Sequence, residues 1–284
     1  MKKIIMTLIT IIVLLPIIFM ISNSFMSAKE ADSRYTELVT PYNSYSSVDG
    51  QHYAEFTLIP TYVTLDGYKK VLTDDQAYLR MFWNSVLITI PIMIGQLLIS
   101  PMAAYAFEMS TWKYKEILYL IYIIVMLMPM QLLMVPHYIT ADFLGYNHTW
   151  WAIILPAIFA PFGTFLLRQQ LSGFDKTLVE AARVEGASEW RVFFKVVLPN
   201  MKATMAALAA LTFVDCWNIV DQAVVFIVDV FKEPLSVYLS KIVQGNPGLV
   251  FSSACIFMVP AILVFLLSHE YMVHGISLSS GRDV

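Results

Sequence analysis

Charged side chains are scarce in this sequence of 284 residues, and their scarcity excludes an ordinary soluble globular domain. Asp, Glu, Lys and Arg make up 14% of the chain, whereas 58% of it is hydrophobic and the mean hydropathy is +0.67. Soluble domains usually carry about 25% charged residues. The net charge of −3 is small and mixed in sign, so we expect no nucleic-acid partner.

Cysteine is nearly absent from the sequence, and so are the common motifs for phosphate binding and for a nucleophilic serine. Cys216 and Cys255 both lie in apolar stretches, where they are expected to be small buried hydrophobic residues without a disulfide framework. None of the eleven glycines is followed by lysine, so the chain has no phosphate-binding P-loop of its own. Ser277 to Ser280 have no Gly-x-Ser-x-Gly motif around them, which removes the support for a nucleophilic serine.

A metal site is not expected either. His269 and His274 superficially resemble the helix of a zinc protease, but five residues on a helix place them about 140° apart. We therefore interpret them as anchors at the end of the last apolar stretch. No catalytic residue, no metal ligand and no cofactor bound by this chain is predicted.

Long apolar runs are present along most of the sequence. A membrane-spanning helix needs about 20 mostly apolar residues, and the sequence predicts an all-α integral membrane protein with about six such helices. They are Ile4 to Ile21, Phe82 to Phe107, Ile117 to Val135, Trp150 to Leu167, Ala203 to about Val228, and Leu249 to Leu267.

The first run has an alternative interpretation as a cleaved signal peptide, because Lys2 and Lys3 precede it. Its apolar part is longer than a signal peptide needs, and Met26 spoils the best cleavage site, before Lys29. We expect it to be retained. The predicted organisation is a first spanning helix at 1–24, an extracytoplasmic segment at 25–80, a membrane-spanning core at 81–275 that includes a loop at 169–202, and a tail at 276–284.

The extracytoplasmic segment has weak local signals. Asp49-Gly50 is a turn dipeptide, so a two-stranded ribbon near residues 36–58 is expected. Residues 64–72 are expected to form a short interfacial helix capped by Thr64 or Asp66.

Lys and Arg are distributed unevenly between the two sides of the predicted spans. Since these residues favour the cytoplasmic side, the bias predicts that both termini and the loop at 169–202 are cytoplasmic. The cytoplasmic set is Lys2, Lys3, Lys113, Lys115, Arg168, Lys176, Arg183, Arg191, Lys195, Lys202 and Arg282, and the outer set is Lys29, Arg34, Lys69, Lys70, Arg80, Lys232 and Lys241.

The loop at 169–202 predicts a pair of short helices. Asp175 is a good N-cap, Lys176 and Glu180 have the spacing of an i,i+4 ion pair, and Gly186 stands where a helix end needs a left-handed residue. Ser188 can cap a second helix that Pro199 would end. Its apolar residues recur at helical spacing and are Trp190, Phe193, Phe194 and Val197.

Such a pair, apolar on one stripe, suits a knob that docks in a groove of another protein. The alternative is an amphipathic pair lying on the lipid surface. Here the sequence resembles a known family: Glu180-Ala181-Ala182, Gly186 four residues after Ala182, and Leu198-Pro199 are similar to the cytoplasmic signature loop of ABC importer permeases.

The wider resemblance is to the carbohydrate branch of that family, the smaller permease of maltose-type systems, and runs from Leu58 to the C-terminus. Residues 25–57 are longer than in that branch, and Val196 stands where isoleucine is usual. The other landmarks are Asn84-Ser85, Ala103 to Phe107, Met128-Pro129, Leu155-Pro156, Phe165 to Arg168, Trp217-Asn218 and Gly275.

The resemblance implies a type I ABC importer in the plasma membrane. Its partners are a homologous second permease, two cytoplasmic ATPase subunits that hydrolyse ATP with Mg²⁺, and an extracellular solute-binding protein. The chain itself is not an enzyme. The residues implied to contact the ATPase are Glu180, Ala181, Ala182, Gly186, Trp190, Phe193, Phe194, Leu198 and Pro199.

Four polar residues in the fifth span form a candidate solute pathway. Asp215, Asn218, Asp221 and Gln222 fall within about a 120° arc of a continuous helix, where they can hydrogen-bond a sugar. The alternative is that they pack against the second permease. Trp217 projects elsewhere and is expected to pack. Other possible functions are a permease for a peptide or a polyamine, a membrane-embedded enzyme or a membrane scaffold.

Overall fold

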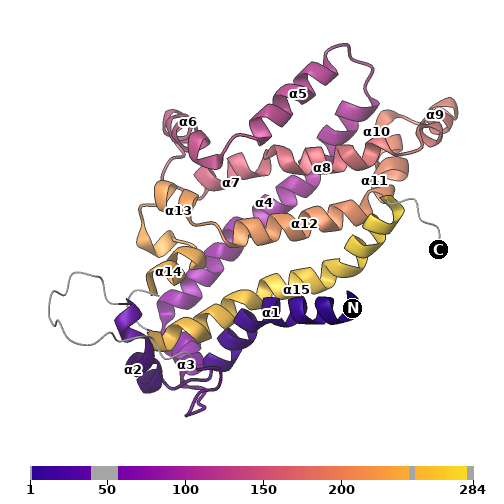
Figure 1. Ribbon diagram of the computed structural model, residues 1–284. Helices are drawn as coiled ribbons and strands as arrows, with labels where there is room; N and C mark the ends of the chain where they lie inside the picture. Colours follow the sequence, from indigo (N-terminus) through magenta and orange to yellow (C-terminus); the bar gives the residue numbers. More distant parts are fainter. Residues whose placement is uncertain (1, 40–56, 243–246, 280–284) are drawn as a thin grey trace. The chain divides into compact units, whose positions relative to one another are not determined.

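The computed structural model describes residues 2–39, 57–242 and 247–279, which are helical with short connections (Figure 1). Within these ranges there is no strand, and one antiparallel bridge pairs Met26 with Val63. The all-α prediction is confirmed. The helices of the first half of the chain are α1 (Lys2–Asn23), α2 (Ala28–Val39), α3 (Asp66–Lys69), the π-helix η1 (Lys70–Asp74), α4 (Gln76–Met109), α5 (Lys115–Met126) and α6 (Met130–Phe143).

The second half is divided into shorter helices, apart from the last. They are α7 (Trp151–Ile158), α8 (Pro161–Ser172), α9 (Lys176–Val184), α10 (Glu189–Val192), the π-helix η2 (Phe193–Val197), α11 (Leu198–Asn200), α12 (Lys202–Trp217), α13 (Asp221–Phe226), the 3₁₀-helix η3 (Val230–Lys232), α14 (Leu235–Ile242) and α15 (Pro247–Ser279).

Four helical stretches of the described chain are long and apolar enough to cross a membrane, or up to six if each bent pair of helices is one span. The four correspond to the first, second, fourth and sixth predicted spans. The third prediction, Ile117 to Val135, is wrong as a straight helix, because α5 and α6 meet at 104°. Pro129 stands at this bend as the N-cap of α6. Proline has no N–H for the helix ladder and disfavours a helical residue before it, which explains the break.

The chain divides into two compact units, residues 1–85 with 230–260, and residues 86–229 with 261–284. In the first unit, Tyr78 of α4 is fully buried and donates its hydroxyl to the carbonyl oxygen of Ser253 at 2.9 Å. Asn84 also belongs to this unit and donates its amide to the carbonyl oxygens of Phe231 and Glu233, each at 2.9 Å. The landmark asparagine therefore ties α4 to the chain before α14.

Glu30 of α2 joins α2 to the chain at residues 61–62. The Glu30 carboxylate accepts the backbone N–H groups of Thr61 and Tyr62 at 2.9 and 3.0 Å, and it pairs with Arg34 at 3.1 Å. Burial of Glu30 opposes its ionisation, but these bonds outweigh the burial and lower the pKa of Glu30.

Two predictions for the segment at 25–80 need correction. Residues 36–39 belong to α2, so the predicted ribbon is wrong there, while 40–56 lie outside the described residues. A short helix, α3, is present there, but neither Thr64 nor Asp66 caps it: its N-cap is Leu65, without a side-chain bond. The backbone N–H of Thr64 is bonded to the carbonyl oxygen of Phe25, next to the Met26–Val63 bridge.

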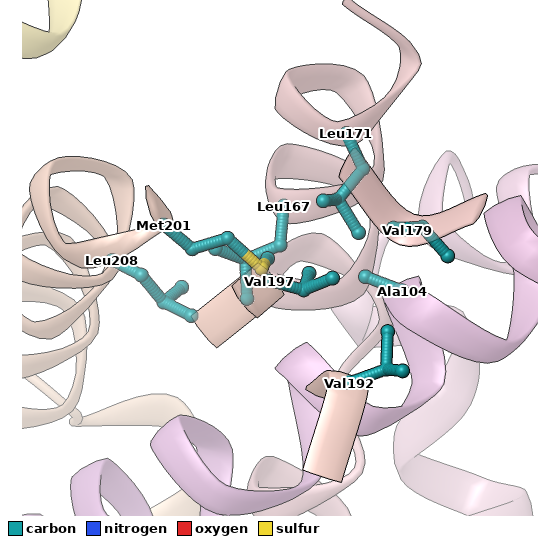
Figure 2. Packing of buried hydrophobic residues seen from close by; sticks show 8 residues of the cluster. All are labelled: Ala104, Leu167, Leu171, Val179, Val192, Val197, Met201 and Leu208. Carbon is teal, nitrogen blue, oxygen red and sulfur yellow. The ribbon is translucent and has the colours of Figure 1, made fainter. Parts of the chain in front are cut away.

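The core of the second unit gathers around the loop at 169–202. Eight buried residues form it, and in Figure 2 Ala104 of α4 lies between Val179 and Val192. The two predicted loop helices therefore pack on the second half of α4 and on α8. The cluster consists of Ala104, Leu167, Leu171, Val179, Val192, Val197, Met201 and Leu208.

Candidate functional site: the loop at 169–202 and the polar end of α12

The first loop helix, α9, begins as the sequence predicts. The Asp175 side chain accepts the backbone N–H of Thr177 at 3.0 Å and its hydroxyl at 2.7 Å, and these bonds lower the pKa of Asp175. The ion pair of Lys176 differs from the prediction: its ammonium contacts Glu108 of α4 at 2.7 Å rather than Glu180 one turn away. Lys176 therefore pairs with a residue distant in the sequence, Glu108, instead of its neighbour on the same helix.

Gly186 ends α9 in the left-handed region with φ +80°, as predicted. The N–H of Gly186 bonds the carbonyl oxygen of Arg183, and the N–H of Ala187 bonds that of Ala182, both at 3.0 Å. These two bonds define a Schellman motif, in which the left-handed residue follows the last helical turn. Ala182 and Ala187 also pack against the same buried cluster, so the turn is attached to the core.

The second loop helix differs from the regular helix that the spacing predicts. Ser188 is its N-cap but makes no side-chain cap bond, and after Val192 the helix widens into η2. Pro199 does not end it, since α11 continues to Asn200 before the chain bends by 74° into α12. A π-helix advances fewer degrees per residue than an α-helix, so the predicted apolar stripe is divided between two faces.

One of these faces is buried and the other is exposed. Phe193 is 4% exposed and lies 5.4 Å from the ring of Tyr105, whereas Trp190 and Phe194 are 61% and 54% exposed and stack at 6.0 Å. The prediction that all three rings face a partner is therefore wrong for Phe193. Trp190 and Phe194 remain as an exposed aromatic pair. In the same loop Glu180, Ala181 and Pro199 are exposed, and Ala182 and Leu198 are half-buried.

A polar contact across Gly186 joins the two loop helices, and sequence reasoning missed it. Arg183 donates to both carboxylate oxygens of Glu189 at 2.8 and 3.1 Å, and the Tyr105 hydroxyl donates to Glu189 at 2.6 Å. The bond from Arg183 is the first cause that lowers the pKa of Glu189. Tyr105 lies within the landmark Ala103 to Phe107, but nothing in its local pattern identifies Glu189 as its partner.

The predicted fifth span is not one continuous helix. α12 ends at Trp217, and Asn218 at its C-cap donates its side-chain amide to the carbonyl oxygen of Val214 at 2.8 Å. A new short helix, α13, starts at Asp221. The single polar stripe is therefore wrong as predicted, because its residues are distributed over α12, the break and α13. Asp215, Asn218 and Asp221 are exposed, and Gln222 is half-buried.

Two further contacts place this segment within the second unit. Asp221 lies 3.4 Å from the amide nitrogen of Gln131 on α6. Trp217 is 1% exposed and stacks on Phe213 at 5.3 Å, which confirms its predicted packing role. The result is a break in the helix, bordered by carboxylate and amide groups, beside a buried aromatic pair.

Comparison with known proteins identifies the class of this arrangement. Residues 96–277 match the family described as "Binding-protein-dependent transport system inner membrane component". The chain belongs to this family. These permeases are membrane subunits of ABC importers and are not enzymes, so the resemblance noted in the sequence is confirmed.

The relatives of this permease include sugar transport proteins. The arabinooligosaccharides transport system permease protein AraQ of Halalkalibacterium halodurans is 32% identical over 77% of this chain and 80% of its own length. The lactose transport system permease protein LacG of Rhizobium radiobacter is 30% identical over 69% of this chain and 72% of its own length.

The fold of the permease matches a solved structure over nearly its whole length. That structure is a bacterial ABC transporter involved in the import of the acidic polysaccharide alginate, with a TM-score of 0.77, 22% identity and 95% coverage of both chains. The type I importer fold is therefore confirmed for this permease.

Proposed function

We propose that this permease forms half of the transmembrane pathway of an ABC importer for a sugar or oligosaccharide. Relatives named for arabinooligosaccharides and lactose support the solute class. A match to an alginate transporter in complex with a pentasaccharide-bound periplasmic protein supports delivery by an external solute-binding protein. The proposed remaining partners are a homologous second permease and two cytoplasmic ATPase subunits, which hydrolyse ATP with Mg²⁺, while this chain binds no cofactor.

The proposal that the loop binds an ATPase subunit rests on the exposed pair Trp190 and Phe194. Two large aromatic rings that are more than half exposed, close to the hydrogen-bonded turn at Gly186, have the geometry of a knob for a groove on another protein. In the proposed mechanism, closure of the ATPases moves the loop, and the spans switch between outward and inward access as rigid bodies. Both termini and the loop are proposed to be cytoplasmic, from the Lys and Arg bias.

The proposed solute contacts are Asp215, Asn218, Asp221 and Gln222 at the break after α12. Non-helical backbone at membrane depth is tolerated where it is buried in protein or lines a water-filled cavity. Discontinuous helices also occur at the solute sites of other transporters. The break therefore supports a pathway role, with packing against the second permease as the alternative.

The experiment is reconstitution of the whole complex in proteoliposomes with its binding protein. We expect ATP-dependent uptake of a neutral oligosaccharide, such as an arabinooligosaccharide, and none of a dipeptide or spermidine. Uptake of the peptide or the polyamine alone would contradict the solute class. An active complex that retains its ATPase after Trp190 and Phe194 are both replaced by alanine would contradict the coupling role.

A further inference from the structure

A cluster of charged side chains surrounds Glu108 at the end of α4, and it joins four helices. The two carboxylate oxygens of Glu108 accept from Arg168 of α8 at 3.2 Å and from Lys176 of α9 at 2.7 Å. Arg168 also donates to both carboxylate oxygens of Glu116 on α5, at 2.9 and 3.0 Å. We name these four residues the Glu108 cluster.

The central pair of the Glu108 cluster is shielded from water. The side chains of Glu108 and Arg168 are each 11% exposed, whereas Lys176 and Glu116 are 52% and 63% exposed. The guanidinium of Arg168 also lies 3.7 Å from the ring centre of Tyr119. Arg168 is thus held by two carboxylates and an aromatic ring, and bonds between ionised groups in a shielded site are stronger than surface ion pairs.

Two members of the Glu108 cluster stand at helix ends that disfavour their charge. Glu108 lies in the last turn of α4, where an acid is repelled by the helix dipole, and Lys176 is the first residue of α9, where a cation is repelled. Each charge therefore opposes its own helix. Arg168 and Lys176 compensate Glu108, and Glu108 compensates Lys176. Both residues go against the usual preference for acids at the start of a helix and bases at its end. Such departures are expected at functional sites, so this contact is a candidate for a functional role.

A second anchor lies one turn earlier on α4. Tyr105 and Glu108 are three residues apart and share one face of the helix. Tyr105 bonds Glu189, the first residue of α10, just as Glu108 bonds the first residue of α9. Ala104, which precedes Tyr105 in the sequence, is fully buried in the cluster of Figure 2. The end of α4 therefore holds the beginning of both loop helices.

We propose that Glu108 is a positioning residue that makes α9 move together with α4, α5 and α8. The proposal rests on the proposed function, in which the loop receives the movement of the ATPase. Lys176 is the only member of the Glu108 cluster that belongs to the loop helices. If the bond between Glu108 and Lys176 is lost, α9 keeps its apolar packing through Val179, but its direct ion pair with the Glu108 cluster is gone.

The test compares Glu108→Gln, Lys176→Met and their double variant in the complete complex with its ATPases and binding protein. The Gln side chain keeps the size of Glu and removes the charge. We expect the kcat of solute-stimulated ATP hydrolysis to fall about tenfold in each single variant, the size of one charge-assisted hydrogen bond. The KM for the solute-loaded binding protein is expected to stay unchanged. The double variant is expected to be no worse than Glu108→Gln alone.

Glu185→Gln is the matched control, since Glu185 is an exposed carboxylate in the same loop. We expect this control to equal the wild type, and Lys176→Arg to restore most of the kcat. Normal kcat in both Glu108→Gln and Lys176→Met, or additive losses in the double variant, would overturn the proposal. If Glu108→Gln fails to assemble, Lys176→Met still decides, because Lys176 is half exposed. A wild-type complex without solute-stimulated hydrolysis would contradict the proposed function instead.

Discussion

Ala187 donates its backbone N–H to the carbonyl oxygen of Ala182 at 3.0 Å and closes the turn around Gly186. The bond explains the spacing of the loop motif. In a Schellman motif the left-handed residue follows the bonded carbonyl by four positions, which is the separation of Gly186 from Ala182. The motif thus encodes a turn that sets the direction of the second loop helix, and with it the place of Trp190 and Phe194.

Gly186→Val is expected to disturb this turn through the backbone alone. A Cβ at Gly186 would meet no atom within 4 Å, so the cost comes from φ +80° and amounts to about 1–2 kcal/mol. We expect reduced ATPase retention or lost stimulation in nanodiscs, with normal membrane insertion. Gly186→Asn is the control, because asparagine tolerates the left-handed region. Equal behaviour of the valine and asparagine variants would contradict this account.

The difference between Phe193 and its neighbours leads to a second prediction. Trp190→Ala and Phe194→Ala remove exposed rings, so we expect the free energy of unfolding to change by less than about 1 kcal/mol while the ATPase is lost on purification. Phe193→Ala empties a buried site and is expected to destabilise the permease by about 3–5 kcal/mol. Thermal unfolding and co-purification, measured in parallel, separate the two effects. A stable Phe193→Ala variant would contradict the packing.

Helix breaks show how far the sequence determines this fold. The bend between α5 and α6 is marked by Pro129. Proline alone does not predict this bend, because Pro91 and Pro260 lie inside the long helices α4 and α15. The end of α12 at Trp217 has no such mark: Ile219 and Val220 are apolar and allow a spanning helix by hydropathy. The break there accompanies the bond from Asn218 to Val214 and the start of α13, which a hydropathy profile does not detect.

In the loop at 169–202, features set by nearby residues were predicted, and features set by tertiary contacts were not. Asp175 and Gly186 act through bonds to residues within five positions, and both were predicted from the sequence. The burial of Phe193 depends on Tyr105 and on the widened turn of η2, which are tertiary features. The Glu108 cluster has only an indirect signal in the sequence: an acid, Glu108, at the end of one helix and a base, Lys176, at the start of another.

The lowered pKa of Glu30 predicts that acid loosens the contact between α2 and residues 57–63. Because folding lowers this pKa, the carboxylate stabilises this contact fully above the unfolded-state pKa of about 4.3, and the stabilisation is lost as the pH falls through the folded-state pKa. We expect deuterium uptake at residues 57–63, corrected for intrinsic rates, to rise below about pH 4. In Glu30→Gln, which does not titrate, uptake is expected to be high at every pH. A wild type without this rise would contradict the prediction.

A buried polar contact within the second unit gives a prediction for stability. Thr212 donates to the Gln96 side-chain oxygen at 2.8 Å, and Gln96 donates to the carbonyl oxygen of Ala157 at 2.8 Å. Pro161 cannot supply the N–H that a continuous helix would give to Ala157. Thr212→Val is expected to lower the free energy of unfolding in bicelles by about 0.5–2 kcal/mol. A double variant with Gln96→Leu tests the pair: strictly additive losses would show that the two side chains act independently.

The last prediction compares Asp215 with Asn218, because their side chains have different surroundings at the end of α12. The Asn218 side chain bonds the carbonyl oxygen of Val214, whereas Asp215 is exposed on the last turn of the helix. Asp215→Ala is therefore expected to weaken solute transport by about tenfold with the complex intact, the cost of one hydrogen bond from a sugar hydroxyl to a carboxylate. Asn218→Ala is expected to combine a similar transport defect with a frayed end of α12, measurable as faster amide exchange at residues 214–218.

The measurement is uptake as a function of solute concentration, alongside size-exclusion analysis of the purified complex. Asp215→Asn is the control: it keeps a hydrogen-bond acceptor and loses the charge, so we expect an intermediate effect. Dissociation of the second permease in Asp215→Ala would favour the packing alternative, since a carboxylate at a subunit interface loses its partner when it is truncated. Unchanged uptake by an intact Asp215→Ala complex would exclude both roles and move the solute contacts to Asp221 and Gln222 or to the second permease.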